Sequence, residues 1–328
     1  MAKILVTGAA GFIGYFISEK LSRNKNDLII LVDNLNRGRF DDEFKKLTLQ
    51  KNVKFIQGDL ADYNFVKNFD NDFDYIYHLA AVIGVKNVEN YPDKVLYVNS
   101  ITILNLFEKM KEMSGLKKFF FSSTSEIYAG TLKHFGIEIP TKENVPLSLD
   151  DIKSSRSTYA LTKMFGESVC FNYGNKYNIP FTIVRYHNVY GPRMGFAHVI
   201  PETFVKIKNS STIKVPSPNH SRAFCFVDDA VEYSIRLCKD PNSNKEIFNI
   251  GNSNEEIKIK DLVALIAKII GKEIIINELD DTLGSPQRRC PDTTKLINFT
   301  NYYPIYNLKD GLKITYDWYK NKLNEVYE

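Results

Sequence analysis

A tyrosine and a lysine four residues apart suggest the first chemistry in this sequence. Tyr159 and Lys163 would lie on one face of a helix, because residues i and i+4 are neighbours there. A free phenol has a pKa of about 10 and is a weak base at neutral pH. A neighbouring ammonium group favours the phenolate, which can then remove a proton from a substrate hydroxyl. Such pairs are common on helices, so the prediction depends on the motifs around this one.

The second motif is a glycine-rich stretch at residues 8–14. Gly8, Gly11 and Gly14 follow the apolar run 3–7, and helical periodicity begins at Phe12. A strand, a glycine turn and a helix form the context in which proteins bind a dinucleotide. The glycines let the backbone approach the pyrophosphate, and the helix N-terminus offers N–H donors to its charge. The spacing Gly-x-x-Gly-x-x-Gly differs from the usual Gly-x-Gly-x-x-Gly and indicates a distinct dinucleotide-binding family.

Asp33 ends the next apolar run, 28–32. It lies about twenty residues beyond the glycines, where a carboxylate hydrogen-bonds the adenosine ribose of NAD. The same charge repels the 2′-phosphate of NADP, so we predict NAD as the cofactor. Arg37 and Arg39 follow closely. Because an arginine nearby accommodates a 2′-phosphate, NADP stays open as the alternative.

Short apolar runs alternate with segments of helical periodicity through the first half of the chain. The runs lie at 3–7, 28–32, 53–56, 75–79, 119–121 and 181–184, and the helical segments at 12–21, 95–113 and 159–177. Strands that alternate with helices predict a parallel sheet covered on both faces. The predicted fold class is therefore α/β, with a Rossmann-type doubly wound parallel sheet.

After residue 185 the pattern becomes irregular and mixed. Strands are expected at 224–227 and 247–250, and helices at 262–270 and about 309–324. We predict that residues 1–185, plus about 224–250, form an NAD-binding Rossmann domain. Residues 186–223 and 251–328 would form mainly a smaller, mixed α/β substrate-binding domain. The substrate is expected at the C-terminal ends of the strands.

Composition excludes several classes of protein. The 328 residues are 44% hydrophobic and 25% charged, as in soluble globular proteins. The 43 basic and 39 acidic residues are scattered, so no nucleic-acid partner is predicted. No apolar run reaches the roughly 18 residues of a membrane span, and the first strand comes too early for a signal peptide. We therefore expect a cytoplasmic protein without a membrane partner. Cys170, Cys225, Cys238 and Cys290 lack metal-ligand spacing, so reduced thiols and no metal are expected.

With these motifs in place, the chain resembles the extended short-chain dehydrogenase/reductase family, and within it the NAD-dependent nucleotide-sugar epimerases and dehydratases. The resemblance extends over nearly the whole chain. It rests on the three glycines, Asp33, Asp59-Leu60, the run 78–81, Thr124, Tyr159 with Lys163, the segment 185–192, Arg222 and the run 289–292. It implies a tightly bound and recycled NAD, a nucleoside-diphosphate sugar as substrate, and a homodimer.

The resemblance also implies a role for each matching residue. Thr124 would hydrogen-bond the sugar hydroxyl beside Tyr159, and Lys163 would hold the nicotinamide ribose and lower the pKa of Tyr159. Ser125 and Glu126 follow directly and complete the expected catalytic set. The expected NAD-binding residues are Gly8, Gly11, Phe12, Ile13, Gly14, Asp33, Asn34, Asp59, Leu60, Leu79, Ala80, Ala81, Asn99, Ser122, Tyr159, Lys163 and Tyr186.

The substrate-binding residues that the resemblance implies are Asn188, Val199, Ile200, Arg222, Arg289 and Arg156. Arginine suits the diphosphate because its planar fork meets phosphate oxygens in pairs. A surface ion pair is the alternative for Arg222 and Arg289. A surface ion pair is the stronger alternative for Arg193 and Arg288.

The residues after Thr124 decide the reaction within this family. Ser125-Glu126 stands where dTDP-sugar 4,6-dehydratases carry Asp-Glu. It is similar to GDP-mannose 4,6-dehydratases and UDP-glucuronate decarboxylases, as is Arg156. Residues 160–162 and 82–92 are more similar to the broad epimerase group. We therefore favour a sugar-nucleotide epimerase that acts through a 4-keto intermediate, with a 4,6-dehydratase or a decarboxylase as the alternative.

Two further classes fit less well. A net reductase of a free carbonyl compound would not need the nucleotide-holding arginines. A regulator that only binds NAD would not need the proton path of Thr124, Tyr159 and Lys163.

The two longest expected helices, 95–113 and 159–177, carry apolar residues on more than one face. These are Leu104, Leu106, Phe107, Phe165, Val169 and Phe171. One helix face must cover the sheet, and the surplus predicts a partner.

Overall fold

The structure is a computed structural model that describes residues 1–282 and 286–323. Its chain divides into two compact units. The first consists of Met1–Gly130, Leu147–Arg185 and Val231–Phe248, and the second of Thr131–Pro146, Tyr186–Ala230 and the chain from Asn249 onwards. The insertion 131–146 groups with the second unit because its backbone pairs there: Thr141 N donates to the Cys290 carbonyl at 2.9 Å.

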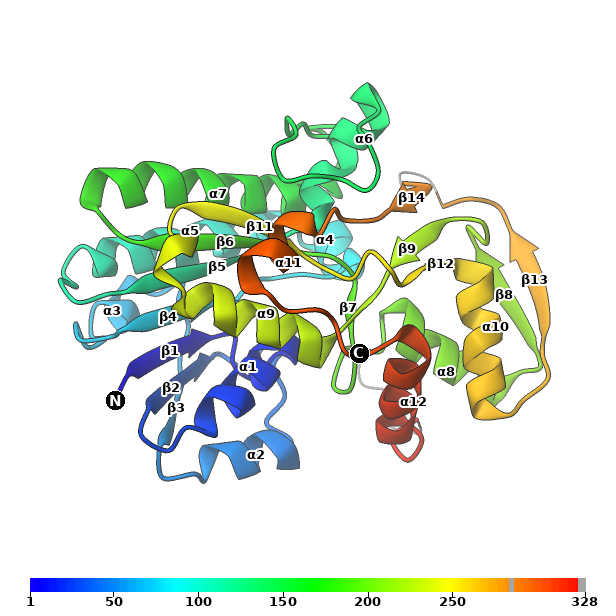
Figure 1. Ribbon diagram of the computed structural model, residues 1–328, viewed down its shortest axis with the longest axis horizontal. Coiled ribbons are helices and arrows are strands. Elements are labelled where there is room, and N and C mark those ends of the chain that lie inside the picture. The colour runs from blue at the N-terminus through cyan, green and yellow to red at the C-terminus, as the bar shows by residue number, and fades with distance from the viewer. Residues whose placement is uncertain (283–285, 324–328) are drawn as a thin grey trace. The chain divides into compact units, whose positions relative to one another are not determined.

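A seven-stranded sheet forms the centre of the first unit (Figure 1). Its strand order is β11-β6-β5-β4-β1-β2-β3, and the pairings from β3 through to β5 are parallel. The strands are β1 Lys3–Thr7, β2 Leu28–Asp33, β3 Val53–Gln57, β4 Tyr75–His78, β5 Lys118–Thr124, β6 Phe181–Tyr186 and β11 Glu246–Ile250. The predicted α/β fold with a parallel Rossmann-type sheet is confirmed.

Helices cover both faces of this sheet. The helices of the first unit are α1 Phe12–Ser22, α2 Asp42–Thr48, α3 Tyr63–Val66, α4 Val85–Asn90, α5 Pro92–Met110, α7 Ser157–Tyr177 and α9 Val227–Lys239, with the 3₁₀ helices η1 Ser125–Tyr128 and η2 Pro241–Ser243. Helix α6 Ala129–Phe135 belongs to the second unit from Thr131 onwards. The helix expected at 95–113 begins earlier, because Pro92 suits the first helical position. It also ends earlier, at Met110.

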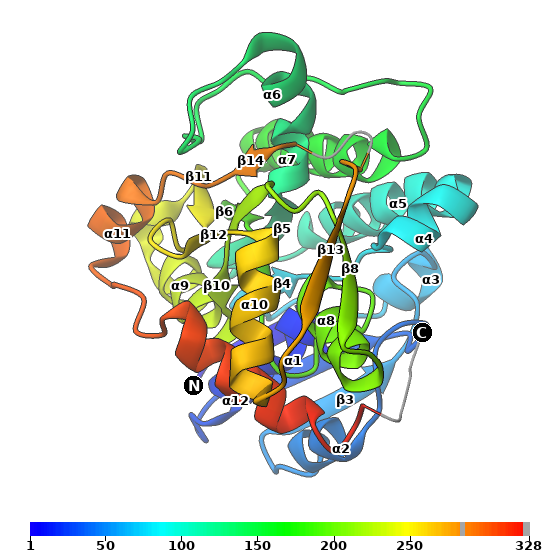
Figure 2. The ribbon, with the colours of Figure 1, turned by 90° about the vertical axis from the view of Figure 1, so that its right-hand side faces the viewer.

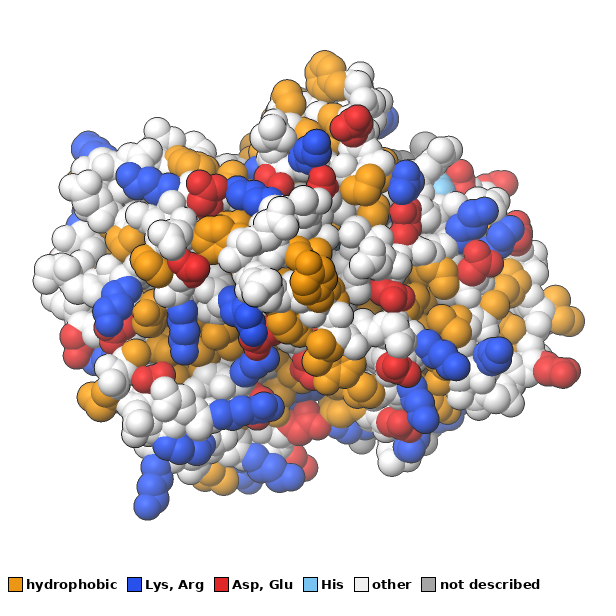
Figure 3. Space-filling model, in the orientation of Figure 1, with side chains coloured by type: hydrophobic (Ala, Val, Ile, Leu, Met, Phe, Trp, Pro, Cys, Tyr) orange, Lys and Arg blue, Asp and Glu red, His pale blue; other side chains and the backbone are white. Residues whose placement is uncertain are grey.

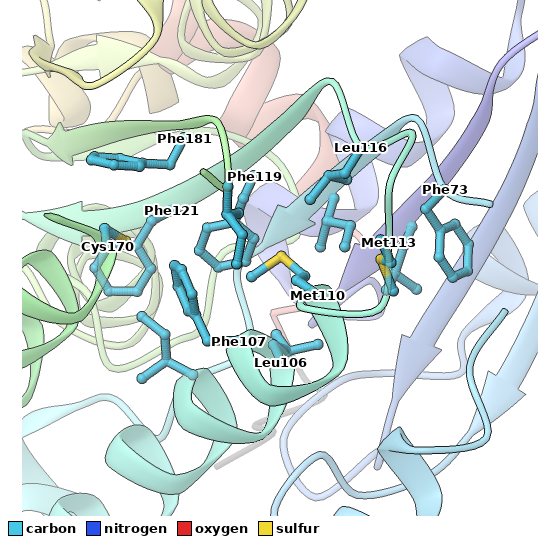
Figure 4. Close-up of a cluster of buried hydrophobic side chains, with 14 of the residues drawn as sticks. Phe73, Leu106, Phe107, Met110, Met113, Leu116, Phe119, Phe121, Cys170 and Phe181 are labelled. Carbon is cyan, nitrogen blue, oxygen red and sulfur yellow. The ribbon is translucent and has the colours of Figure 1, made fainter. Parts of the chain in front are cut away.

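The core between the sheet and the helices α3, α5 and α7 combines aliphatic side chains with a group of phenylalanines (Figure 4). Phe119 and Phe121 of β5 face Phe107 of α5 and Phe181 of β6, and each is at most 2% exposed. On the opposite face, α1 and α9 are joined by an ion pair between Lys20 and Glu232 at 2.5 Å. Burial on both faces explains why the strands read as continuous apolar runs rather than alternating ones.

The second unit is smaller and mixed. Its elements are β7 Val189–Tyr190, α8 Val199–Asn209, β8 Thr212–Pro216, β9 Ser221–Ala223, β10 Cys225–Phe226, β12 Glu256–Lys258, α10 Ile259–Ile270, β13 Ile275–Leu279, β14 Arg288–Arg289, α11 Thr294–Thr300 and α12 Leu308–Tyr319. Strands β8 and β13 pair in parallel beside α10 (Figure 2). The last helix, expected to run to 324, ends at Tyr319, and residue 324 lies outside the described ranges.

Basic and acidic side chains are interspersed on the face shown in Figure 3. None of the helices in the described ranges combines the length and apolar character that a membrane crossing requires.

Candidate active site

Helix α7 and strand β5 bring the expected catalytic residues together in the first unit. Thr124 ends β5, and Tyr159 lies in the first turn of α7. The hydroxyl groups of Thr124 and Tyr159 are close enough for Thr124 to lower the pKa of Tyr159, against the effect of burial. Thr124 Oγ1 also accepts a bond from Glu126 N at 3.3 Å, which caps η1 and fixes the start of the Ser125-Glu126 segment. Thr124 and Tyr159, which are 35 residues apart in the sequence, therefore lie beside each other.

Lys163 is held close to Tyr159. Its Nζ donates to the Ser122 carbonyl at 2.7 Å and lies 5.8 Å from the centre of the Tyr159 ring. The side chain is buried, with 4% exposure. Burial lowers the pKa of Lys163 to about 8, and the nearby Cys170 and Glu167 oppose that shift. The Lys163 ammonium is therefore held by the backbone carbonyl of Ser122 and not by a carboxylate.

The expected lowering of the Tyr159 pKa is not what these residues produce. Burial raises the pKa of Tyr159, and the charge of Glu126 raises it further. The hydrogen bond from Thr124 and the charge of Arg37 act in the opposite direction without overcoming burial. Desolvation wins because a phenolate loses more hydration energy in this site than the neighbouring groups return.

The glycine loop lies against the end of β4. Gly8 has a φ of +69°, and a Cβ atom there would lie 2.7 Å from Ala80 N. A Cβ at Gly14 would lie 2.1 Å from the Gly8 carbonyl oxygen. Only glycine permits these approaches. The expected residues Leu79 and Ala80 therefore adjoin the loop that contains Gly8, Gly11 and Gly14, with Phe12 and Ile13 in the first turn of α1.

Asp33 anchors the same loop. Its carboxylate accepts hydrogen bonds from Ala10 N at 3.0 Å and Leu35 N at 2.8 Å, and burial raises its pKa. The neighbouring Asn34 donates to Asp59 at 3.4 Å. These three expected residues thus lie together at the ends of β2 and β3. Leu60, by contrast, is buried in the core, and its carbonyl accepts from Asn105.

Asn99 braces the segment after β4. Its side chain donates to the Val82 carbonyl at 3.0 Å and accepts from Val82 N at 2.7 Å. It also donates to Thr162 on α7 at 3.2 Å. The chain that follows Ala81 is therefore fixed relative to the helix of Tyr159.

The expected substrate residues lie mainly in the second unit. Strand pairing places Arg222 of β9 directly beside Arg289 of β14. Asn188, with a φ of 37°, donates to the Ala223 carbonyl at 3.0 Å next to this pair. Two guanidinium groups on adjacent strands repel each other unless an anion neutralises them. Three segments far apart in the sequence thus come together around neighbouring positions of β9 and β14.

The remaining expected residues lie in other surroundings. Arg288 forms a two-bond ion pair with Glu256 at 2.7 and 2.8 Å, as the surface alternative anticipated. Arg156 donates to Glu89 of α4 at 3.0 Å. Val199 and Ile200 begin α8, where Ile200 is fully buried, and Tyr186 ends β6.

A family model described as the NAD dependent epimerase/dehydratase family matches residues 4–251. The chain belongs to this family. It is therefore an enzyme of an NAD-dependent family whose members act on nucleotide sugars.

Relatives of this chain in the epimerase/dehydratase family include decarboxylases and 4-epimerases. The chain is 30% identical to UDP-N-acetyl-alpha-D-glucosaminuronate decarboxylase of Bacillus cytotoxicus, over 98% of this chain and 99% of that one. It is also 30% identical to UDP-glucuronate 4-epimerase of Thermodesulfobacterium geofontis, over 99% and 98% of the two chains. The solved structure of UDP-glucuronic acid 4-epimerase from Bacillus cereus, in complex with UDP-glucuronic acid and NAD, matches with a TM-score of 0.82. That structure is 27% identical and covers 99% of this chain and 100% of its own.

The residues of the first unit fit the NAD that the family implies. Helix α1 begins at a glycine cap without a side-chain hydrogen bond, and its first turn has no acidic residue. Its N-terminal N–H groups therefore suit a pyrophosphate. The close contacts at Gly14 and the carboxylate of Asp33 match the requirements of a dinucleotide site.

Sequence reasoning missed one buried group beside the catalytic residues. Glu167 on α7 bonds Ser123 of β5 and Arg185 of β6, all at most 5% exposed. The spacing of four residues between Lys163 and Glu167 was the available signal, since it continues the face of Tyr159 by another turn.

Proposed function

We propose that this enzyme is a 4-epimerase of a nucleoside-diphosphate sugar, with a UDP-linked sugar as the favoured substrate. The observation that carries the proposal is the contact of Thr124 with Tyr159, beside the buried ammonium of Lys163. The Thr124 hydroxyl can bind a sugar hydroxyl, and Tyr159 can receive its proton when it is ionised to the phenolate. The Lys163 ammonium and the positive charge of a bound nicotinamide ring would favour that phenolate against the effect of burial. The relatives that act on UDP-linked sugars support the choice of nucleotide.

Each residue would have a defined task in this reaction. Tyr159 accepts the proton of the C4 hydroxyl and later returns it. Thr124 donates to the same oxygen and holds it in line, and Lys163 orients the ribose of the cofactor. NAD, when bound, supplies the two-electron oxidation and reduction at C4. Arg222 and Arg289 bind the diphosphate, because their adjacent positive charges match its charge and spacing.

A second reaction at the 4-keto stage is the competing proposal. The charge of Glu126 acts on Tyr159, so its carboxylate lies near the reacting sugar. A carboxylate there could take a proton from C5 once C4 is a ketone, because the ketone stabilises the carbanion. A 4,6-dehydratase of the GDP-mannose type would need such a base. The decarboxylases among the relatives favour loss of a C6 carboxylate instead.

The deciding experiment incubates the enzyme with UDP-, GDP-, dTDP- and CDP-sugars, including the UDP-uronates, and analyses the products by mass spectrometry and NMR. Loss of water indicates dehydration, and loss of carbon dioxide indicates decarboxylation. An unchanged mass with a new NMR spectrum indicates epimerisation. Denaturation of the purified protein should release tightly bound NAD. Absence of released cofactor would favour a net reductase, which exchanges it with solvent.

The resemblance to this family and the exposed apolar side chains of α5 and α7 lead us to propose a homodimer. Of the apolar residues that the sequence places on several faces of these helices, Leu106, Phe107 and Val169 are buried, with at most 5% exposure. Phe165 stays 37% exposed. Leu96 and Tyr97 of α5, which the sequence analysis did not single out, are 38% and 62% exposed.

An exposed apolar strip along two adjacent helices is costly in water, and a second copy of the same strip would cover it. Light scattering at micromolar concentration should give twice the chain mass. Tyr97→Glu should shift the protein to the monomer, whereas a monomeric parent protein would contradict the proposal.

A further inference from the structure

A buried ion pair lies directly behind the catalytic residues of the first unit. Glu167 is one turn beyond Lys163 on α7, and Arg185 lies on β6. Arg185 Nε donates to Glu167 Oε1 at 2.9 Å, and Arg185 Nη2 donates to Oε2 at 2.7 Å. The two residues are 2% and 5% exposed. Both carboxylate oxygens are therefore engaged by one guanidinium group.

Further contacts hold this pair in one geometry. The Ser123 hydroxyl on β5 donates to Glu167 Oε1 at 2.6 Å. Arg185 Nη1 donates to the Tyr128 hydroxyl of η1 at 2.7 Å, and the guanidinium lies 5.0 Å over the Tyr128 ring. The planar fork of arginine allows three such contacts at once, which a lysine could not make.

The alternative partner of Glu167 is Lys163. Lysine and glutamate at positions i and i+4 are the usual ion pair of a helix, and a buried pair interacts far more strongly than an exposed one. Yet Lys163 Nζ donates to the Ser122 carbonyl, toward Tyr159. Without Arg185, a buried and unpaired carboxylate would remain one turn away from that ammonium, and a buried unpaired charge is strongly unfavourable.

We propose that Arg185 is a positioning residue that occupies Glu167 and thereby keeps the Lys163 ammonium directed at Ser122 and Tyr159. The inference rests on the proposed function, in which Lys163 serves Tyr159. It differs from a merely structural role, in which the pair fastens α7 to β6 and leaves the state of Lys163 unaffected.

The surroundings of Lys163 make the effect measurable. The titratable groups that face it are His78 on β4 and Tyr159, Glu167 and Cys170 on α7. Burial lowers the pKa of His78 to about 3 and raises that of the Cys170 thiol, so both stay neutral at physiological pH. Glu167 is therefore the neighbouring group that would change the proton affinity of Lys163 if its ion pair with Arg185 were lost.

The test measures how the modification of Lys163 by acetic anhydride depends on pH, read by mass spectrometry of the peptide that contains it. The midpoint is the pH at which half of the Lys163 side chains react. In Arg185→Met we expect this midpoint to move to higher pH by about one unit or more, since the opposite charge of Glu167 at short range would favour the ammonium. Turnover should fall by at least about tenfold, the scale of a misplaced catalytic group. In the double variant Arg185→Met/Glu167→Gln, the midpoint should return toward the parent value and most of the turnover should recover.

Lys118→Met is the matched control, because Lys118 is a buried cation of the same unit that bonds only neutral groups, the Asp240 carbonyl and Ser243. It should leave the Lys163 midpoint unchanged. If Arg185→Met does not fold, Arg185→Lys serves instead, because it keeps the charge and loses the fork, and a smaller shift in the same direction is expected.

An unshifted midpoint in the folded Arg185 variant, or a double variant no more active than Arg185→Met, would overturn the proposal. The modification profile needs no substrate. If the parent enzyme leaves every nucleotide sugar unchanged, the proposed function fails while the profile still decides the role of Arg185.

Discussion

Replacing Tyr159 with phenylalanine separates the chemical role of its hydroxyl group from a structural one. The substitution removes one oxygen and keeps the ring, so the packing of α7 is preserved. The hydroxyl interacts with Thr124, and even a full hydrogen bond typically contributes only about 0.5–1.5 kcal/mol to the free energy of unfolding. A structural role therefore predicts a small effect on stability and a comparably small effect on turnover.

The proposed proton transfer predicts a much larger kinetic effect. General base catalysis contributes about 10²–10⁴-fold, which corresponds to roughly 3–5 kcal/mol of activation free energy. Tyr159→Phe should thus lose at least about a hundredfold in turnover, while its melting temperature changes little and denaturation still releases NAD. The assay is single-turnover conversion of the nucleotide sugar identified in the substrate panel.

Tyr177→Phe provides the matched control. Tyr177 lies at the other end of α7, about 27 Å along the helix axis at 1.5 Å per residue, and Lys111 Nζ lies 4.4 Å from the centre of its ring. It should keep full turnover with a similar small change in stability. Turnover of Tyr159→Phe within about threefold of the parent enzyme, far short of the general-base range, would refute the proton-transfer mechanism.

Three further predictions test the second reaction, the catalytic lysine and the cofactor site. Glu126→Gln should reduce turnover only modestly in a simple 4-epimerase, whereas in an enzyme that removes the C5 proton the 4-keto stage should accumulate. Stopped-flow absorbance of reduced nicotinamide distinguishes the two outcomes, and near-normal turnover would exclude the C5 role. Lys163→Met should inactivate the enzyme yet stabilise it at pH 7 by about 1–3 kcal/mol. The folded pKa of about 8 lies below the ordinary 10.5, so burial of the ammonium costs about 3 kcal/mol below pH 8, partly offset by the lost bond to Ser122. Between pH 8 and 10.5 the unfolded chain still holds the Lys163 proton that the folded chain has released. The free energy of unfolding of the parent protein should therefore rise with pH in this range, and that of Lys163→Met should not. Urea titrations at several pH values measure this, and the same dependence on pH in both proteins would contradict the prediction. Gly14→Ala should lower the amount of NAD recovered on denaturation, because its Cβ would lie 2.1 Å from the Gly8 carbonyl oxygen; an unchanged NAD content would show that the loop can move aside.

Several features of this enzyme could be predicted from the sequence because they depend on local pattern. The apolar runs gave the strands of a parallel sheet, since a strand covered on both faces needs apolar residues at every position. The spacing of Tyr159 and Lys163 gave a shared helix face, and the glycine spacing gave a close turn before α1. Helix ends were less accurate, as at α5, because the first and last turns depend on capping and tertiary contacts.

Features that depend on contacts between distant segments could not be predicted. The register of β9 with β14 places Arg222 beside Arg289, and no local pattern encodes that pairing. The insertion 131–146 interrupts the first unit in sequence but bonds to the second. The sequence showed apolar residues on more than one face of α5 and α7, and only the folded chain showed that Leu106 and Phe107 are among those buried in the core.

The sequence by itself determined which groups could do chemistry, because residue type and helical or strand spacing set the chemical properties and local direction of a side chain. The tertiary structure decided the state of those groups. Burial raises the pKa of Tyr159 and lowers that of Lys163 to about 8, and Arg185, reached from another strand, takes Glu167 as its partner. Desolvation and long-range pairing depend on the whole fold, and for that reason they cannot be read from spacing along the chain.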